Sequence, residues 1–512
     1  MQRYLLSILA LVLILFWSSC RKDFEYQASI GNLEFSKDTV YLDTVFTNIG
    51  SSTYSLKVYN KSNIDIQIPH INLENGENSN YRLNVDGVAG KEFNNIPILA
   101  KDSIFIFIET TFDIAPTNEK DFLYTDALQF ISNGNTQKVQ LVTLIKDAIF
   151  LFPKQLSNGT KETLGLGVDE EGNEISVEGF ILESSQLTLT NEKAYVVYGY
   201  AAVPENETLN INAGARVHFH ENSGIIVQNN ASIKVQGQLS LDVAEMENEV
   251  IFEGDRLEPE FEYIPGQWGT IWLAPGSINN EINHLTIKNA TIGILAEGDG
   301  ILSSPTLTFR NSQIHNSSRV NLWARTASII GENLVLGNAG ASSLYCNLGG
   351  SYYFTHATIA NYWNNGFRNS PSLLIDNLIE TENGTVLEDL VEANFTNCIV
   401  DGNNTHELFL QNNELASFNF SFKNCTLKYN ESSNLVVGNP ILDLDNPGYN
   451  SIVLNPLTNF IEVQKNDFRI GEESEVIDKG DTNAAQTLPL DIIGTDRTSS
   501  PDIGAYEFVQ NK

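Results

Sequence analysis

The strongest constraint on the fold is a four-residue pattern that returns about every 22 residues. It consists of Asn, Asp or His, two further residues and an aliphatic residue, as in "NATI". It begins at Asn289, Asn311, Asn333, His356, Asp376, Asn397 and Asn424, giving intervals of 22, 22, 23, 20, 21 and 27 residues. A period this short indicates a solenoid, in which each repeat contacts only its neighbours.

Each repeat predicts short strands and not helices. There is no sustained helical spacing of apolar residues, and β-branched residues, Asn and Gly are frequent. Parallel strands on successive coils, stacked at the usual strand spacing, bury a shared interior. The sequence therefore predicts an all-β fold with a parallel β-helix over 191–430, right-handed by the rule for parallel connections.

The recurring Asn has a structural explanation. A sharp turn between strands needs a residue that tolerates the left-handed backbone region, and Asn is the best choice after Gly. Stacked Asn side chains also bond along the column as an amide ladder. In this register Lys288, Arg310 and Glu332 form an outward charged column, and His356 and Asp376 are neighbouring rungs.

The flanking segments complete the domain prediction. Six period-2 runs between 30 and 150 predict an Ig-like β-sandwich. Residues 151–190 are predicted as a linker and 431–512 as a cap on the open end of the solenoid. The linker carries the acidic residues Asp169, Glu170, Glu171 and Glu174. Calcium binding is one interpretation of that cluster and a solvated loop is the other, because the spacing of a calcium loop is lacking.

The first nineteen residues are predicted to be a signal peptide. Arg3 precedes an apolar run that is too short to span a bilayer comfortably, and small residues then lead to Cys20. The segment resembles a bacterial lipoprotein signal peptide, although Trp17 replaces the usual aliphatic residue. The resemblance implies that Cys20 is lipidated, that 20–29 is a tether and that the protein is an outer-membrane lipoprotein, facing the cell surface or the periplasm. The alternative is an ordinary signal peptide.

The charge restricts the partners. The chain has 64 acidic and 30 basic residues, a net charge of −34. Nucleic acids and anionic lipid surfaces attract basic proteins, so neither is an expected partner. The expected contacts are a membrane through the anchor at Cys20 and, on the solenoid, a polysaccharide.

Three blocks carry a family resemblance. They are "GQWGTIWLAPGSINNEINHLTIKNATIGI", "GGSYYFTHATIANYW" and the closing "PDIGAYE". They resemble those of bacterial right-handed β-helix lipoproteins with a pectate-lyase-like fold. The resemblance implies architecture and not activity, because this fold carries lyases, hydrolases, adhesins and proteins of other kinds.

The search for catalytic residues gives one basic patch. Inverting hydrolases need paired carboxylates, which would stand at matching positions of adjacent coils, and no such pair is in register. His315, Arg319 and Arg325 are close in sequence, and a lyase uses such residues to neutralise a uronate and remove a proton. No cysteine and histidine spacing fits zinc, so no metal site is predicted. Cys398 and Cys425 stack as a disulfide or as buried thiols.

Aromatic residues suggest a glycan surface. Exposed aromatic rings stack on sugar rings, and Trp268 and Trp272 share parity on one predicted strand. The candidate carbohydrate-binding residues are Trp268, Trp272, Arg310, Tyr353, Tyr362, Trp363 and Arg368. Polysaccharide binding is the first hypothesis. A lyase or hydrolase acting along the β-helix and a structural or adhesive rod are the alternatives, and the sequence does not decide whether the protein is an enzyme.

Overall fold

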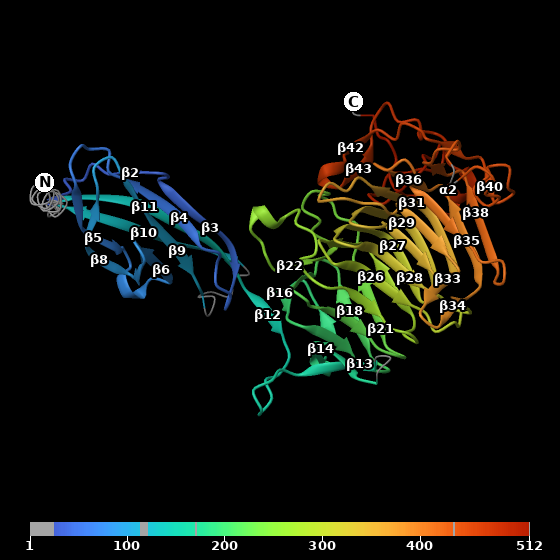
Figure 1. The fold of residues 1–512 in the computed structure, drawn as a ribbon, viewed down its shortest axis with the longest axis horizontal. Coiled ribbons are helices and arrows are strands. Elements are labelled where there is room, and N and C mark those ends of the chain that lie inside the picture. Colours follow the sequence, from blue (N-terminus) through green and yellow to red (C-terminus); the bar gives the residue numbers. More distant parts are fainter. Residues whose placement is uncertain (1–24, 113–120, 169–171, 434–435, 511–512) are drawn as a thin grey trace, which may run out of the picture. The chain divides into compact units, whose positions relative to one another are not determined.

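The computed structural model describes residues 25–112, 121–168, 172–433 and 436–510. The chain divides into two compact units, Met1–Asp147 and Ala148–Lys512, and both are built from β-strands (Figure 1). The predicted signal peptide, Cys20 and three residues of the acidic cluster (169–171) lie outside the described residues. Within the described part of the chain, no helix is long and apolar enough to cross a membrane.

The first unit contains two sheets around one core. The first sheet holds β1 (Gln27–Ala28), β5 (Ile66–Leu73), β10 (Asp121–Ser132), β11 (Asn135–Lys146), β3 (Thr39–Phe46) and β8 (Glu92–Ile98). The second holds β2 (Glu34–Phe35), β4 (Tyr54–Tyr59), β9 (Ser103–Thr110), β6 (Tyr81–Val85) and β7 (Val88–Gly90). Val40, Leu56, Ile68 and Ile106 are buried in the same apolar cluster. Alternating apolar residues from both sheets therefore form the core of a sandwich.

The second unit winds through three faces in turn. Face 1 consists of β14 (Glu174–Ile181), β17 (Tyr200–Val203), β20 (Gly224–Val227), β23 (Ile271–Leu273), β26 (Ile292–Glu297), β28 (Val320–Arg325), β30 (Leu344–Asn347), β32 (Leu373–Asp376) and β37 (Leu408–Gln411). Each strand pairs in parallel with the strand one coil further on. The antiparallel hairpin of β13 (Thr163–Val168) and β14 begins this face.

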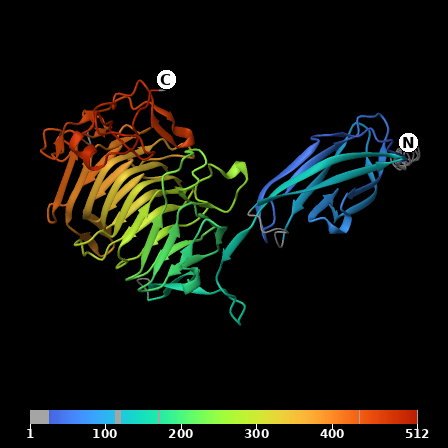
Figure 2. The same ribbon diagram turned by 180° about the vertical axis from the view of Figure 1, so that it is seen from behind.

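Faces 2 and 3 meet at a corner and share three long strands. Face 2 consists of β15 (Thr188–Leu189), β18 (Thr208–Asn212), β21 (Ser232–Gln236), β24 (Asn280–Asn283), the first halves of β27 (Leu307–Ser317), β29 (Ser328–Ala339) and β31 (Gly350–Asn361), β35 (Leu390–Thr396), β38 (Phe418–Lys423) and β40 (Tyr449–Asn450). Face 3 consists of β12 (Ala148–Leu151), β16 (Ala194–Val197), β19 (Arg216–Phe219), β22 (Val250–Gly254), β25 (Leu285–Lys288), the second halves of the same long strands, β36 (Ile399–Gly402), β39 (Thr426–Leu427) and β41 (Val453–Leu454). This long parallel arrangement is consistent with the predicted β-helix (Figure 2).

The predicted amide ladder lies at the corner between faces 2 and 3. Asn311, Asn333 and His356 have φ angles of 46°, 53° and 54°, the left-handed region that turns the chain there. Asn311 donates from Nδ2 to Oδ1 of Asn283 at 2.9 Å, and Asn333 donates to Oδ1 of Asn311 at 2.9 Å. The structural interpretation of this Asn column is confirmed.

Two of the seven predicted rungs lie elsewhere. Lys288 aligns with His315, so Asn289 belongs to a second corner, where Asn316 donates from Nδ2 to its Oδ1 at 2.6 Å. Asp376 lies at the end of β32 on face 1, so the predicted pairing of His356 with Asp376 was wrong. The cause is that each coil has two Asn-type corners, and that insertions lengthen the coil between His356 and Asn397.

The interior explains the large residue before each rung. The rings of Phe354 and Phe395 stack with centroids 5.2 Å apart, and those of Phe395 and Phe422 stack at 4.9 Å. Beside them Cys398 and Cys425 are buried free thiols, and the backbone N–H of Cys398 points to Sγ of Cys425 at 3.4 Å. Of the two interpretations of these cysteines, the structure has the buried thiols.

The ends of the second unit differ from their predictions. The segment 151–190 is not a linker, because β12 pairs with β16 and β14 with β17. Only the start of the 431–512 segment covers the open end, and the rest runs back across the outside of face 3 (Figure 1). Phe468 and Tyr506 pack there on Val335 and Ala360 of the long strands. This segment contains β42 (Phe460–Glu462), β43 (Asp467–Ile470) and α2 (Thr482–Thr487).

Candidate functional site

An apolar and aromatic stripe runs along the outside of face 1. Ile271 and Leu273 are buried in the core, so Trp272 between them points outward. The parallel register then aligns one outward residue from each following coil: Trp272, Leu295, Trp323, Tyr345, Leu374 and Phe409. All six are half-buried. These six residues are called the face 1 stripe below.

The centre of the stripe is its most aromatic part. The rings of Trp323 and Tyr345 lie with centroids 5.6 Å apart and planes inclined by 19°. The guanidinium of Arg319 lies 5.9 Å from the centroid of Trp323, a cation–π distance. The indole Nε1 of Trp323 is buried and has no hydrogen-bond partner within the described residues. An unsatisfied buried donor of this kind is uncommon in native proteins.

Polar groups border the stripe on one side. Trp272 donates from Nε1 to Oε2 of Glu297 at 2.7 Å, and Arg325 lies 3.5 Å from the other oxygen of that carboxylate. Tyr345 donates its hydroxyl to Oδ2 of Asp376 at 2.8 Å. Burial raises the pKa of Asp376 above its usual value, although these hydrogen bonds oppose the shift. The border thus holds the aromatic rings in fixed orientations.

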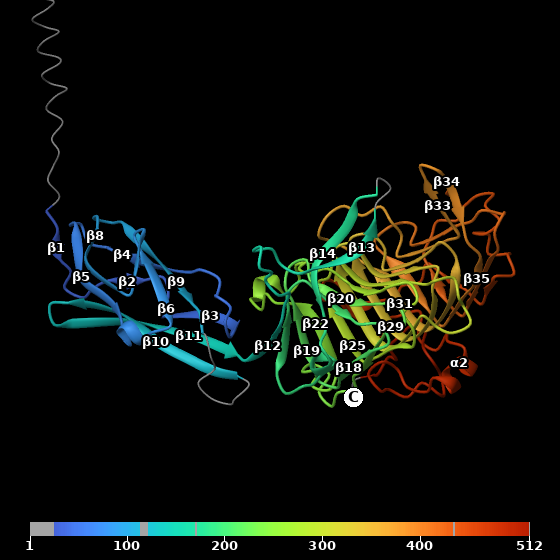
Figure 3. The same cartoon turned by 90° about the horizontal axis from the view of Figure 1, so that it is seen from below.

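Two hairpins stand beside face 1. The β13–β14 hairpin places Leu164 against Ala202 and Ile226 of the first coils. The second hairpin, of β33 (Leu378–Thr381) and β34 (Gly384–Leu387), follows β32 directly. Both project on the same side of the second unit in Figure 3. Trp272, the first residue of the stripe, packs against the cluster that the β13–β14 hairpin forms on the first coils.

The predicted basic patch is not assembled. His315 lies on the outer side of face 3, next to Lys288 in the register. Arg319 and Arg325 instead lie at face 1, where Arg325 pairs with Glu297. Residues close in sequence are separated because the chain turns from face 3 to face 1 after Asn316. The hypothesis that His315, Arg319 and Arg325 act together was wrong.

Trp268 is a core residue and not a glycan contact. It is 1% exposed, stacks on Phe219 with centroids 4.4 Å apart, and donates from Nε1 to the carbonyl of Lys288 at 2.8 Å. The prediction that Trp268 and Trp272 face the same side of one strand was wrong, because strand β23 begins only at Ile271. Of these two tryptophans, Trp272 alone reaches the outer surface.

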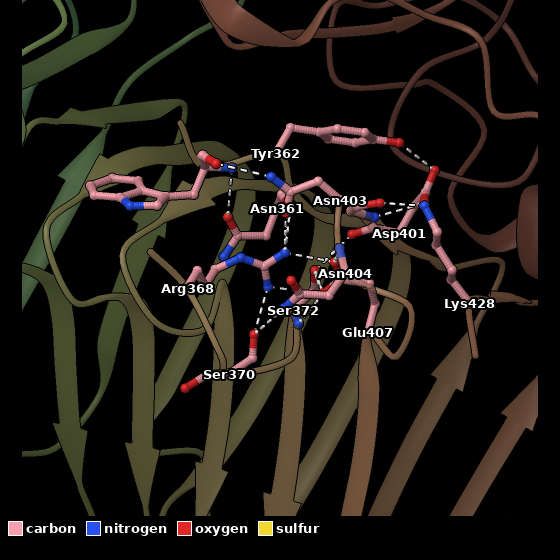
Figure 4. Close-up of polar contacts among 12 residues, drawn as sticks. Asn361, Tyr362, Arg368, Ser370, Ser372, Asp401, Asn403, Asn404, Glu407 and Lys428 are labelled. Atoms are coloured by element: carbon pink, nitrogen blue, oxygen red, sulfur yellow. Dashed lines mark hydrogen bonds and ion pairs between the residues drawn. The ribbon is translucent and has the colours of Figure 1, made fainter. Parts of the chain in front are cut away.

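Arg368 is also buried, in a polar network at the edge of the coils (Figure 4). Its guanidinium pairs with Glu407 at 2.6 Å and donates to the carbonyl oxygens of Ser370 and Asn361 at 2.6 and 2.8 Å. Glu407 in turn accepts from the backbone N–H of Ser372 at 2.8 Å. The network ties the loop after β31 to the following coil, so Arg368 has a structural role.

The remaining aromatic candidates lie in the interior, against the C-terminal segment and on face 2. Trp363 is buried. Tyr362 donates its hydroxyl to Asp401 at 2.7 Å and its ring packs edge-on against Phe460 of the C-terminal segment. Tyr353 is 40% exposed on face 2, away from the stripe. Neither Tyr362 nor Trp363 lies in the face 1 stripe.

Arg310 lies on the outside of face 2 and pairs with Glu332 at 2.5 Å. The sequence register predicted that Lys288 continues this column. Lys288 instead lies on face 3, where it pairs with Glu253 at 3.4 Å. Within the described residues, no group of three or more His, Cys, Asp and Glu side chains is placed to hold a metal ion.

Trp323 and Tyr345 were not among the predicted site residues. The signal that reveals them is the alignment of the face 1 strands "TIWLA", "GILAE", "NLWAR" and "SLYCN", which puts a large residue at the same outward position. That alignment was hidden because the repeat was counted from the Asn corner and the loops before face 1 vary in length.

Three solved structures illustrate what this chain is similar to. A complex of XylC with xylose covers 95% of this chain and 88% of its own, with a TM-score of 0.29 at 8% identity. The catalytic domain of a GH87 alpha-1,3-glucanase in complex with nigerose covers 74% and 81%, with a TM-score of 0.19 at 10% identity. A PapD-like domain of human CEP192 covers 22% and 84%, with a TM-score of 0.16 at 10% identity. These scores assign no activity, and no family model or curated protein matches the chain.

Proposed function

We propose that the second unit binds an extended polysaccharide along the face 1 stripe. The observation that carries the proposal is the outward alignment of Trp272, Trp323 and Tyr345 on nearby coils. A pyranose ring has an apolar face of C–H groups and a rim of hydroxyls. Aromatic rings cover the apolar face, while charged groups such as Glu297 and Arg325 beside the rings bond the hydroxyls.

Binding without cleavage is the form of the proposal that the side chains favour. Glu297 already bonds Trp272 and Arg325, and the carboxylate of Asp376 already bonds Tyr345. A general acid or base needs to reach the proton it transfers. Carboxylates that are engaged in this way are better suited to orienting rings and hydroxyls than to transferring protons.

The location of the protein is part of the same proposal. Lipidation at Cys20 would anchor the chain in the outer membrane, since acyl chains contribute roughly 0.8 kcal/mol for each buried CH₂ group. The first unit, as an Ig-like sandwich, would be a spacer between that anchor and a right-handed β-helix. The short apolar run after Arg3 and the net charge of −34 support a secreted, anchored protein.

Retention of the purified full chain on immobilised polysaccharides tests the function. The panel contains neutral and uronate-containing polymers, and Trp323→Ala is compared with Tyr353→Ala, a change of an exposed aromatic residue on face 2. Retention that Trp323→Ala removes and Tyr353→Ala preserves supports the proposal. Lack of retention on every polymer, or equal retention of both variants, rejects it.

Product analysis separates binding from catalysis in the same incubations. Ultraviolet absorbance detects the unsaturated sugars that a lyase releases, and a reducing-end assay detects hydrolysis. New product on any polymer would replace the binding proposal with the enzyme alternative. Its loss in Trp323→Ala would then place the reaction on face 1.

A further inference from the structure

A cavity lies on face 3, away from the face 1 stripe. It has a volume of about 420 Å³, within the range usual for small-molecule sites. Its floor is the outer surface of β25 and β27, with Lys288, Gln313 and His315. Glu249 and Tyr263 come from the loops on either side of β22, and Arg469 comes from the C-terminal segment. Three separate parts of the second unit therefore enclose one space.

Two cations of the cavity lining are paired with carboxylates of the protein. Lys288 pairs with Glu253 at 3.4 Å, and Arg469 with Asp467 at 2.5 Å. Burial raises the pKa of Glu249 and so favours its neutral form. Lys288 and Arg469 would repel a cationic ligand. Because each is already paired with a carboxylate of the protein, neither is left to attract an anionic ligand. The lining therefore suits an uncharged ligand.

His315, on the floor of the cavity, has an unsatisfied hydrogen-bonding group. Its Nδ1 is buried without a hydrogen-bond partner, and no described residue bonds to either ring nitrogen. Burial and the neighbouring Lys288 lower the pKa of His315 to about 3, so its imidazole is neutral at physiological pH. A neutral imidazole offers one donor and one acceptor, which is the same combination that a hydroxyl group needs in a partner.

The walls supply apolar surface to match the polar floor. The ring of Tyr263 is 38% exposed at the rim, and Ile492 and Ile493 face the cavity from the C-terminal segment. On the floor Gln313 donates from Nε2 to the hydroxyl of Thr286 at 3.0 Å, which fixes its amide. Hydroxyl-binding groups thus lie below a partly apolar enclosure.

We propose that this cavity binds a neutral, hydroxyl-rich molecule of the size of a single sugar residue. Tyr263 covers the C–H face of the ring, and His315, Gln313 and Glu249 bond its hydroxyls. The C-terminal segment forms one wall of the site, which gives the segment a role beyond covering face 3. The site does not depend on the face 1 stripe and holds even if the stripe binds nothing.

Saturation-transfer NMR and titration calorimetry on the purified full chain test the site. The probes are neutral hexoses and pentoses, with glucuronate and inorganic phosphate as charged comparisons. His315→Leu removes both ring nitrogens with little change of volume, and Tyr263→Ala removes the wall. Tyr353→Ala is the matched control because that tyrosine is 40% exposed outside the cavity, and thermal unfolding verifies that each variant is folded.

The expected result is binding of at least one neutral sugar at one per chain, weakened about tenfold or more by His315→Leu and by Tyr263→Ala. Tyr353→Ala should leave this binding unchanged. The proposal is overturned if every neutral sugar fails to bind, or if phosphate or glucuronate binds in preference. It is also overturned if Trp323→Ala abolishes binding that both cavity variants retain, a result that instead supports the face 1 stripe.

Discussion

Trp323 stacks on Tyr345 of the next coil, with ring centroids 5.6 Å apart, and the Tyr345 hydroxyl donates to Asp376 at 2.8 Å. The hydrogen bond fixes the tyrosine ring, and the ring in turn supports the indole. The aromatic surface is therefore preorganised before any ligand arrives, which reduces the entropy lost on binding.

Tyr345→Phe separates the ring from its hydrogen bond. The phenylalanine keeps the stacking surface, but Asp376 loses a donor while remaining buried, so the second unit should lose about 1–3 kcal/mol of stability. Retention on polysaccharide should fall less than in Trp323→Ala. Denaturant unfolding and retention assays on both variants give the comparison, and a larger binding loss in Tyr345→Phe would show that the hydroxyl itself contacts the glycan.

Replacing Trp268 and replacing Trp272 should have opposite consequences. Trp268→Ala opens a cavity in the core and should destabilise the second unit by about 3–5 kcal/mol, with little effect on glycan retention in molecules that stay folded. Trp272→Ala should weaken retention with a smaller loss of stability. Unfolding curves and retention assays on the two variants separate the roles. Equal destabilisation by the two changes would contradict the assignment of Trp272 to the outer surface.

Two pairs of residues show where prediction from the sequence succeeds and where it fails. The repeat of Asn311 and Asn333 predicts the corner, because only a few residues accept its backbone geometry. Parity between Trp268 and Trp272 holds only inside one strand, and the strand boundary at Ile271 is set by packing. A residue pattern that backbone geometry requires can thus be predicted from the sequence. The direction of a side chain near the end of a strand cannot, because packing sets the strand boundary.

Contacts distant in sequence account for the other differences. Asp376 matched the repeat by spacing alone, because an insertion made one long coil resemble two short ones. Arg368 looked like a surface cation beside aromatic residues, but its partner Glu407 lies 39 residues further on. The cavity around His315 needs the C-terminal segment, whose path back across face 3 has no local signal. Positions of this kind depend on the closed tertiary structure.

The Arg368–Glu407 pair should behave as a buried ion pair. Their side chains are 2% and 0% exposed, so removing one partner leaves an uncompensated buried charge. Arg368→Met and Glu407→Gln should each destabilise the second unit by about 3–5 kcal/mol. The double variant should lose less than the sum of the two, as unfolding of all four proteins would reveal. Additive losses would mean that the two side chains act independently.

The ladder rung at Asn333 combines backbone strain with hydrogen bonds. Its φ is 53°, and Nδ2 donates to Asn311 and to the carbonyl of Leu490, both at 2.9 Å. Asn333→Ala loses the bonds and strains the backbone, whereas Asn333→Gly loses only the bonds. The alanine variant should be less stable than the glycine variant by about 1–2 kcal/mol. Thermal unfolding measures the difference, and a more stable alanine variant would refute the left-handed assignment.

His356 gives the second unit a sensitivity to acid. Its Nδ1 bonds the carbonyl of Gly504 at 3.1 Å, and its Nε2 accepts from Nδ2 of Asn397 at 2.9 Å, so it is neutral. A proton on Nε2 would face the amide donor, whose orientation is fixed because Oδ1 of Asn397 accepts from Asp481 N–H at 2.6 Å. Burial accordingly holds the pKa of His356 well below its usual value.

The folded pKa of His356 lies below the unfolded one, so the unfolded chain binds more protons as the pH falls below about 6.5. His356 therefore costs no stability above that pH and contributes a decline of about 1.4 kcal/mol for each unit below it, until its folded pKa is reached, and His315, whose pKa is also lowered, adds to the total decline. His356→Asn restores the residue of the other rungs and should flatten this decline. Unfolding measured between pH 7 and pH 5, with His406→Asn as a control away from the ladder, tests the prediction. If His356→Asn follows the same pH profile as the unchanged protein, the acid sensitivity arises from another group.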